Sequence, residues 1–238
     1  AGHVRAEHRQ VLAKNLAVGQ FADGALAQAN LRGRGRGQEP CGERALTEFR
    51  RLGDTLGAAN ALVALGIVHA DRGESAAARA CYEEGMPLLL RAGDPMTIAA
   101  VLGNLGYLAY REGNLPEARR LLEQQLAAFR TLRDRTMLAN ALNTYGAVLD
   151  ACGDAGAART AFEESLSLRE SLGLRALAGA TLGNLATLAC AEKDFAKARA
   201  YFARNLDIAK EAADAWPRAR AIARFADLES AAGRPERA

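Results

Sequence analysis

An arginine recurs at forty-residue intervals, at Arg79, Arg119, Arg159 and Arg199. A row of guanidinium groups could bind phosphates, because arginine donates paired hydrogen bonds to phosphate oxygens. Each of these arginines follows an alanine, however, and acidic side chains such as Glu83 and Glu163 stand four residues further on. Ordinary ion pairs between residues i and i+4 of a helix are therefore preferred to a phosphate site.

A second cluster of arginines lies in the stretch LRGRGRGQEP, residues 31–40. Three Arg-Gly pairs in a row are typical of tracts that bind nucleic acids. Residues 1–50 hold eight basic and five acidic side chains, whereas residues 51–238 hold 23 of each. A nucleic-acid-binding body normally carries a basic surplus on its own surface, so binding through this tract is only a minor alternative.

The chain shows no other pattern that would support catalysis. It has no phosphate-binding loop, no GxSxG and no HExxH, and Glu83 and Glu84 point apart if they lie on a helix. The four cysteines form no CxxC pair, and no histidine lies near them at metal-ligand spacing. We therefore expect no enzyme, no metal and no cofactor, with reduced and mostly buried thiols and His69 packed between helices.

These residues are positioned by a repeat of forty residues. The blocks 51–90, 91–130, 131–170 and 171–210 align without a gap, and a partial fifth block covers 211–238. Residues 1–50 align as a degenerate first repeat, in which the Arg-Gly stretch 31–40 is a loop ahead of a shortened helix. Repeats of this length predict a solenoid.

Each block predicts two helices. The first carries a small residue in its middle, Gly66, Gly106, Gly146 or Ala186, which indicates close approach of a partner helix. The second carries a large apolar residue four positions after a fixed alanine: Tyr82, Leu122, Phe162 or Phe202. Gly53, Gly93 and Gly173 are suited to helix C-caps, and Asp54, Asp94 and Asp134 to N-caps. The fold class is therefore all-α, a solenoid of antiparallel helix pairs.

Pro87 falls inside the second helix of its block, shortly after Gly85. Proline in a helix removes one backbone hydrogen bond and clashes with the preceding turn. We therefore expect a kink or an early end of this helix near Gly85.

The Leu-Gly pair, the turn, the fixed alanine and the apolar residue after it together resemble tetratricopeptide repeats. The stretch LGNLGYLAYREGNLPEARRLLEQQL is the best copy, and the resemblance covers about residues 51–238. It implies a right-handed superhelix. The forty-residue length is similar to the long-helix variants of kinesin light chains and of the C-terminal regions of large bacterial regulators, such as ATPase-coupled transcription activators. That placement implies a bacterial, cytoplasmic protein.

The resemblance also implies that the first helices line a concave groove. Spacings of four, three and four residues identify the side chains that would point into it, several of which are asparagines. The amide group donates and accepts hydrogen bonds, which suits the backbone of an extended peptide. Equally, these residues could bond neighbouring helices across the repeat boundaries. The candidate groove residues, including two at its edges, are Asn60, Asp71, Asn104, Tyr107, Tyr110, Arg111, Asn140, Asn143, Thr144, Asn184 and Thr187.

The leading hypothesis is a non-enzymatic module that binds a peptide or a partner domain in this groove, as part of a larger bacterial signalling or regulatory protein. An effector-sensing region of a transcription regulator is the alternative. No stretch is long and apolar enough to cross a membrane. The last block lacks most of its second helix, so its exposed apolar face could pair with a second copy of the chain.

Overall fold

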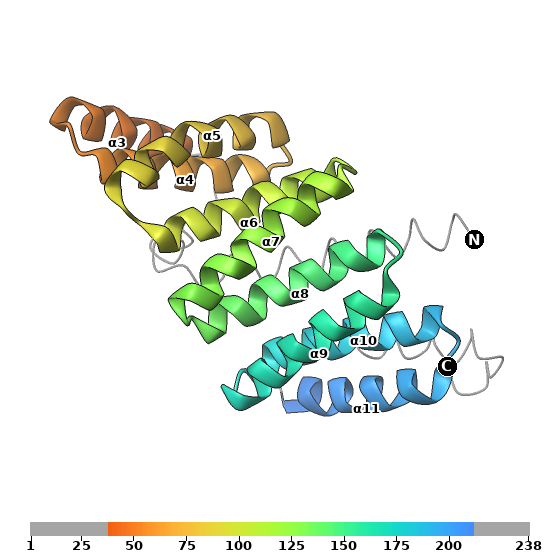
Figure 1. The fold of residues 1–238 in the computed structure, drawn as a ribbon. Helices are drawn as coiled ribbons and strands as arrows, with labels where there is room; N and C mark the ends of the chain where they lie inside the picture. The colour runs from red at the N-terminus through yellow and green to blue at the C-terminus, as the bar shows by residue number, and fades with distance from the viewer. Residues whose placement is uncertain (1–37, 212–238) are drawn as a thin grey trace. The chain divides into compact units, whose positions relative to one another are not determined.

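A computed structural model describes residues 38–211, with side chains from 42 to 210. These residues form nine α-helices and no strand (Figure 1). The helices fall into two units, one ending at Asp134 and the other beginning at Arg135. The first unit contains α3 (Gln38–Leu52), α4 (Thr55–Asp71), α5 (Ser75–Ala92), α6 (Pro95–Arg111) and α7 (Leu115–Leu132). The second contains α8 (Arg135–Ala151), α9 (Ala155–Ser171), α10 (Arg175–Ala191) and α11 (Phe195–Glu211).

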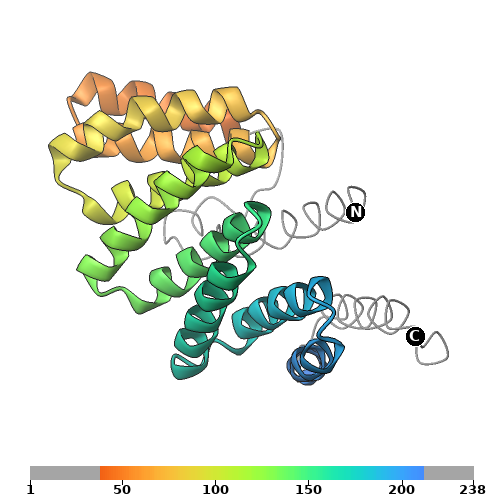
Figure 2. The same ribbon diagram turned by 45° about the vertical axis from the view of Figure 1, so that its right-hand side comes forward.

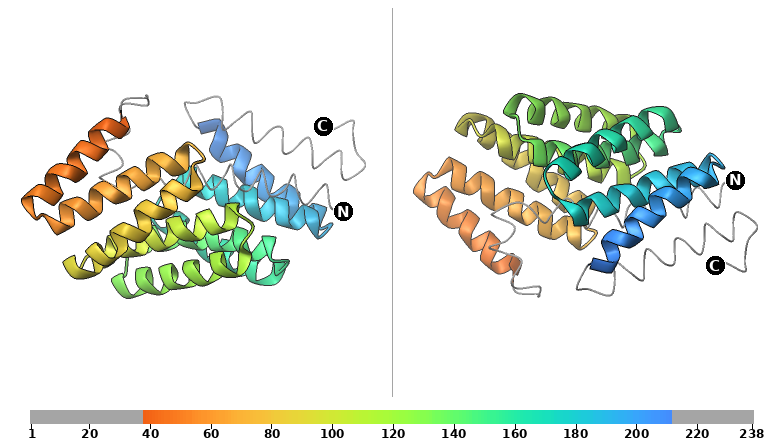
Figure 3. Two further views of the ribbon diagram at one scale, coloured as in Figure 1. Left: turned by 90° about the horizontal axis from the view of Figure 1, so that it is seen from above. Right: turned by 90° about the horizontal axis from the view of Figure 1, so that it is seen from below.

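Within each unit every helix packs against the next one along the chain. In the α3–α7 unit, α4 lies beside α5 (Figure 2), and α4 also touches α6. In the α8–α11 unit, α10 and α11 form an antiparallel pair, drawn in blue in Figure 3. The expected all-α fold of stacked helix pairs is confirmed. The first helices, α4, α6, α8 and α10, begin forty residues apart.

The turns use the residues that the sequence pattern assigned to them. Gly93 ends α5 in the left-handed conformation, with φ of 70°, and Gly53 and Gly173 have φ values of 71° and 70°. Asp54 accepts a hydrogen bond from the Gly57 amide at 2.8 Å, and Asp94 accepts one from the Thr97 amide at 3.1 Å. These carboxylates satisfy amide groups that have no partner inside the helix. The cap at Asp134 stays a prediction.

Two turns depart from this pattern, and one of them has Arg133, with a φ of 56°, in the column of Gly53, Gly93 and Gly173. In the other turn, Lys193 has a φ of 63°, whereas the matching turns carry Gly73, Gly113 and Gly153. Lys193→Gly is expected to raise the free energy of unfolding by about 0.5–1 kcal/mol. The left-handed conformation costs a residue with a Cβ about 1–2 kcal/mol, and the greater freedom of glycine in the unfolded chain offsets part of that gain. Urea unfolding followed by circular dichroism measures the change.

The control for this prediction is the same replacement at Lys197, inside α11. There glycine should lower the free energy of unfolding by about 0.5–1 kcal/mol, because Lys197 has ordinary helical backbone in the first turn of α11 and its side chain pairs with Asp194 at 3.2 Å. Equal effects at the two lysines would contradict the role assigned to the backbone of Lys193.

The small residues of the first helices mark close approach of the second helices, as expected. A Cβ added at Gly66 would stand 2.5 Å from a ring carbon of Tyr82, and one at Gly146 would stand 2.7 Å from a ring carbon of Phe162. Both rings are fully buried. Glycine is therefore required here by packing between helices.

The helix does not end early near Gly85, because α5 continues through Pro87 to Ala92, and the alternative, a kink, stays a prediction. Tyr82 and Leu89, on either side of the proline, are both fully buried in the core. Gly85 packs against Leu62 and the backbone of Ala59. This packing on both sides outweighs the hydrogen bond that the proline removes.

The expected loop 31–40 is shorter than predicted, because α3 begins at Gln38. Pro40 therefore lies in the first turn of the helix, where no backbone amide needs a partner within the helix. The rest of the Arg-Gly stretch, the partial fifth block and the C-terminal end proposed for dimer formation lie outside the described residues. In the part of the chain that is described, no helix is long and apolar enough to cross a membrane.

Candidate functional site

The asparagines of the α8–α11 unit bond one another. Asn184 of α10 donates a hydrogen bond to the side-chain oxygen of Asn143 of α8, at 3.2 Å. Their exposed fractions are only 2% and 6%. In this unit the two amides hold successive first helices together, which is the stacking role that the sequence left open.

Asn140 has a different partner. Its side-chain oxygen accepts a hydrogen bond from Nη2 of Arg169 at 2.9 Å. Arg169, on α9, is only 2% exposed, and its Nη1 donates to the backbone oxygen of Leu177 and to the hydroxyl of Thr181 on α10. The guanidinium thus joins three helices in the interior, so Asn140 is also engaged in packing between repeats.

The two threonines of this set bond within their own helices. The hydroxyl of Thr144 donates to the backbone oxygen of Asn140, and that of Thr187 donates to the backbone oxygen of Gly183. Thr144 is 1% exposed. The structure therefore turns most of the predicted groove residues of the α8–α11 unit toward its own helices.

The same columns of the repeat differ in the α3–α7 unit. Asn104 corresponds to Asn184, but the position of Asn143 is occupied by Val63, which cannot bond an amide. Asn60 corresponds to Asn140, but the position of Arg169 is occupied by Leu89. The buried side-chain oxygen of Asn60 accordingly has no hydrogen-bond partner. The asparagines of this unit therefore do not form the hydrogen bonds between repeats that Asn140 and Asn184 form in the α8–α11 unit.

Three further predicted residues converge where α4 ends. Nη1 of Arg111 reaches the backbone oxygen of Ala70 at 3.4 Å. Burial raises the pKa of Tyr107, the positive charge of Arg111 lowers it, and the negative charge of Asp71 raises it again, so these charges act on the phenol at close range. Asp71 and Arg111 are themselves exposed. We name the surface formed by Asn60, Asp71, Asn104, Tyr107 and Arg111 the α4–α6 face.

Buried tyrosines line the back of this face. Tyr110, predicted at the groove edge, is 7% exposed and belongs to the core of α6. Tyr82 of α5 lies near the Asn104 side chain, and burial strongly raises the pKa of its phenol. The polar surface of the α4–α6 face is therefore carried by Asn104, Asp71 and Arg111, with Tyr107 between them.

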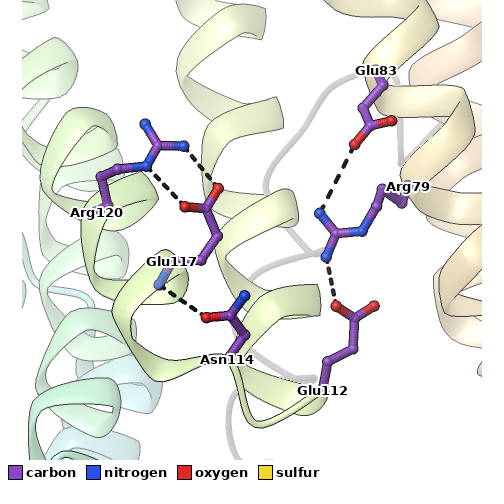
Figure 4. A network of polar contacts seen from close by, with 6 residues as sticks. All are labelled: Arg79, Glu83, Glu112, Asn114, Glu117 and Arg120. Atoms are coloured by element: carbon purple, nitrogen blue, oxygen red, sulfur yellow. Dashed lines mark hydrogen bonds and ion pairs between the residues drawn. The ribbon is translucent and has the colours of Figure 1, made fainter.

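The recurring arginines join successive repeats. Arg79 of α5 contacts Glu112, at the end of α6, at 2.6 Å and Glu83 at 4.0 Å (Figure 4). In the α8–α11 unit, Arg159 pairs with Glu192 rather than with the expected Glu163. In both cases the acidic partner directly follows the first helix of the next repeat. Spacing of four residues within one helix does not predict such a partner. This pairing agrees with the structural interpretation of the arginine column.

Nearby features of the same unit are also structural. Figure 4 shows Asn114 capping α7 by accepting from the Glu117 amide, while Glu117 bonds Arg120. Nδ1 of His69, in the last turn of α4, lies 2.6 Å from a carboxylate oxygen of Glu74, the residue before α5. Neither contact leaves a polar group arranged for catalysis.

The cysteines only partly match the expectation of buried thiols. Cys81 and Cys190 are half-buried free thiols, and burial raises the pKa of Cys190 to about 11, which keeps it protonated. Cys152 is exposed. Among the described residues, no group of three or more His, Cys, Asp or Glu side chains could hold a metal ion.

Sequence reasoning missed Arg169. The repeat alignment contained the signal, because the same column holds Phe49, Leu89 and Phe129, which are all apolar. A charged residue in an otherwise apolar column indicates a buried polar network. Its partners give no comparable signal, since Asn140 fits a groove-facing position and a single threonine such as Thr181 is ordinary in a helix.

Comparisons with known proteins agree with this architecture. A family model described as tetratricopeptide repeat matches residues 97–171, from the first turn of α6 to the end of α9. No protein of curated function matches the chain in sequence.

Solved structures share the fold. BtubC from P. vanneervenii has a TM-score of 0.74 at 19% identity, over 90% of this chain and 87% of that one. A Rap protein in complex with Competence and Sporulation Factor has a TM-score of 0.64 at 15% identity, over 88% of this chain and 69% of that one. PilF of Pseudomonas aeruginosa has a TM-score of 0.55 at 19% identity, over 85% and 89% of the two chains.

Proposed function

We propose that the chain is a non-enzymatic module that binds an extended peptide on the α4–α6 face, because residues 97–171 match a model of tetratricopeptide repeats, a fold of protein-interaction domains. One observation carries the proposal. Asn60 and Asn104 stand in columns whose members in the α8–α11 unit bond neighbouring helices. In the α3–α7 unit the positions of those partners are occupied by Leu89 and Val63, which cannot form these hydrogen bonds. Polar groups kept half-buried without such a partner are suited to a ligand.

The chemistry of the face favours a peptide that carries an acidic group. The half-buried amide of Asn104 can both donate to and accept from a peptide unit. Arg111 is exposed and makes only a long contact of 3.4 Å to Ala70, so its guanidinium can turn toward a carboxylate. Asp71 beside it disfavours a second acidic group at the same point.

The similarity to a Rap protein that holds Competence and Sporulation Factor supports a ligand-binding role for this kind of fold. We further propose that the chain is part of a larger bacterial regulatory protein and works in the cytoplasm. The partner is then a peptide or another domain of the same protein.

The test is selection of random linear dodecapeptides displayed on phage against the full chain. Selected peptides are expected to contain an acidic residue and to bind the Asn104→Ala/Arg111→Ala variant about tenfold or more weakly. The loss of one neutral and one charge-assisted hydrogen bond predicts a change of this size. Fluorescence anisotropy with labelled synthetic peptides measures the affinities.

Arg120→Ala is the matched control, because Arg120 is an exposed arginine of α7 that pairs with Glu117 away from this face. It should leave peptide affinity unchanged. If no peptide is enriched, or if the selected peptides bind the double variant as tightly as the unaltered protein, the α4–α6 face is not the binding site.

A further inference from the structure

Two opposite charges stand at corresponding places on the α4–α6 face. Asp71 is the last residue of α4 and Arg111 is the last residue of α6, forty positions further on, and both side chains are exposed. Helices α4 and α6 contact each other, and Nη1 of Arg111 reaches the backbone oxygen of Ala70, the residue next to Asp71. The two charges therefore lie close together at one end of the face.

The fold does not need charges in this column. The corresponding residues of the α8–α11 unit are Ala151 and Ala191, yet all four first helices, α4, α6, α8 and α10, are 17 residues long. The charged pair occurs in the unit in which Asn60 and Asn104 lack the hydrogen bonds between repeats. Charged and amide side chains that the solenoid does not need thus coincide on one face, as expected of residues that serve a ligand.

The other charges near these two helix ends are directed elsewhere. Glu112 follows α6 and contacts Arg79 of α5 at 2.6 Å (Figure 4). Glu74 lies 2.6 Å from Nδ1 of His69. Arg72 stands in the column of Glu112, so the repeat places it on the side of the second helices as well. The face itself therefore presents one carboxylate and one guanidinium, with no net charge.

The guanidinium of Arg111 is not held by a carboxylate. Nη1 donates to the backbone oxygen of Ala70 at 3.4 Å, and among the described residues no carboxylate lies within ion-pair distance of it. Burial raises the pKa of Tyr107, the positive charge of Arg111 lowers it, and the negative charge of Asp71 raises it. The two charges thus flank one buried ring, while both charged side chains stay in contact with solvent.

We propose that Asp71 is a specificity-determining residue of the α4–α6 face, which selects peptides with a basic residue beside the acidic residue that Arg111 binds. The proposal rests on the peptide binding proposed for this face and names the class of peptide. A peptide with both charges forms a charge-assisted hydrogen bond at each side chain, whereas a purely acidic peptide brings a like charge to Asp71. Exposed pairs of this kind contribute little affinity, but they decide between competing peptides.

The test starts from dodecapeptides selected on the full chain and synthesised in two forms. One form has the selected sequence, and in the other the acidic residue and its basic neighbour exchange places. The unaltered protein should bind the selected form about threefold or more tightly than the exchanged form. The variant Asp71→Arg/Arg111→Asp keeps the net charge and exchanges the two charges, so it should invert this preference. Fluorescence anisotropy measures the four affinities.

A milder variant tests the same role if circular dichroism shows that the double variant is unfolded. Asp71→Asn removes the carboxylate at nearly constant size and should weaken the selected peptides about threefold. It should bind them no more tightly than peptides whose basic residue is replaced by glutamine. Glu123→Gln is the matched control, because it removes an exposed carboxylate of α7, a second helix, where Glu123 pairs with Arg119 at 2.9 Å. It should leave peptide affinity unchanged.

The outcomes distinguish the role of Asp71 from peptide binding itself. Selected peptides that bind Asn104→Ala/Arg111→Ala more weakly but carry no basic residue beside the acidic one refute the role of Asp71 and leave peptide binding in place. The same holds if these peptides bind Asp71→Asn as tightly as the unaltered protein, or if a folded double variant keeps the original preference. If no peptide depends on Asn104 and Arg111, both proposals are wrong.

Discussion

Replacing Arg169 with alanine is expected to lower the free energy of unfolding by about 2–4 kcal/mol. The arginine is 2% exposed, so its removal leaves a cavity between α9 and the neighbouring first helices. It also leaves the side-chain oxygen of Asn140 and the backbone oxygen of Leu177 without the guanidinium that they accept from, at 2.9 and 2.7 Å. Relief of the buried charge offsets only part of this cost.

A second variant separates the polar cost from the loss of volume. The corresponding positions of the α3–α7 unit hold Leu89, Val101 and Asn60, and the next repeat has Ala100 in the column of Asn140. The triple variant Arg169→Leu/Asn140→Ala/Thr181→Val combines these three apolar residues in the α8–α11 unit. It should have a free energy of unfolding within about 1 kcal/mol of the unaltered protein, since a buried polar network replaced by apolar side chains is often neutral.

Urea unfolding followed by far-ultraviolet circular dichroism compares the three proteins. Arg169→Leu alone should lie between the others, because it restores volume but leaves the oxygen of Asn140 unsatisfied. A triple variant as unstable as Arg169→Ala would show that the network itself, rather than the absence of unpaired groups, stabilises the α8–α11 unit.

The fold could be predicted from the sequence because its determinants repeat. The small residue at Gly66, Gly106 and Gly146 and the large apolar residue opposite it recur every forty residues, and so do the caps at Asp54 and Asp94. Tertiary packing can override a local rule. Pro87 does not end α5, because the buried residues on both sides hold the helix in place.

The role of the asparagines could not be predicted from their own column. Asn184 is a stacking residue because Asn143 stands 41 positions before it, and Asn104 is not, because Val63 stands there instead. The same dependence distinguishes Asn140 from Asn60. Each assignment rests on one residue in another helix, and pairings of this kind are visible only once the helices are placed in space.

Gly66→Ala is expected to lower the free energy of unfolding by about 1–3 kcal/mol, although alanine is the better helix former. The added Cβ would stand 2.5 Å from one ring carbon of Tyr82 and 2.8 and 2.9 Å from two others. Tyr82 is fully buried, so the ring cannot move aside without disturbing the core that it shares with Leu89 and Leu105. Overpacking of this kind outweighs the gain in helix propensity.

The same column provides a graded control. Gly146→Ala, whose Cβ would stand 2.7 Å from the Phe162 ring, should be destabilising to a similar extent. Gly106→Ala should be clearly less destabilising, because its Cβ would stand 3.0 and 3.2 Å from two carbons of the buried Leu122, a smaller overlap, and alanine strengthens the helix. Equal urea midpoints for all three variants would refute the packing explanation. A loss confined to Gly66 and Gly146 would show that the aromatic ring opposite, rather than the position in the repeat, is what requires glycine.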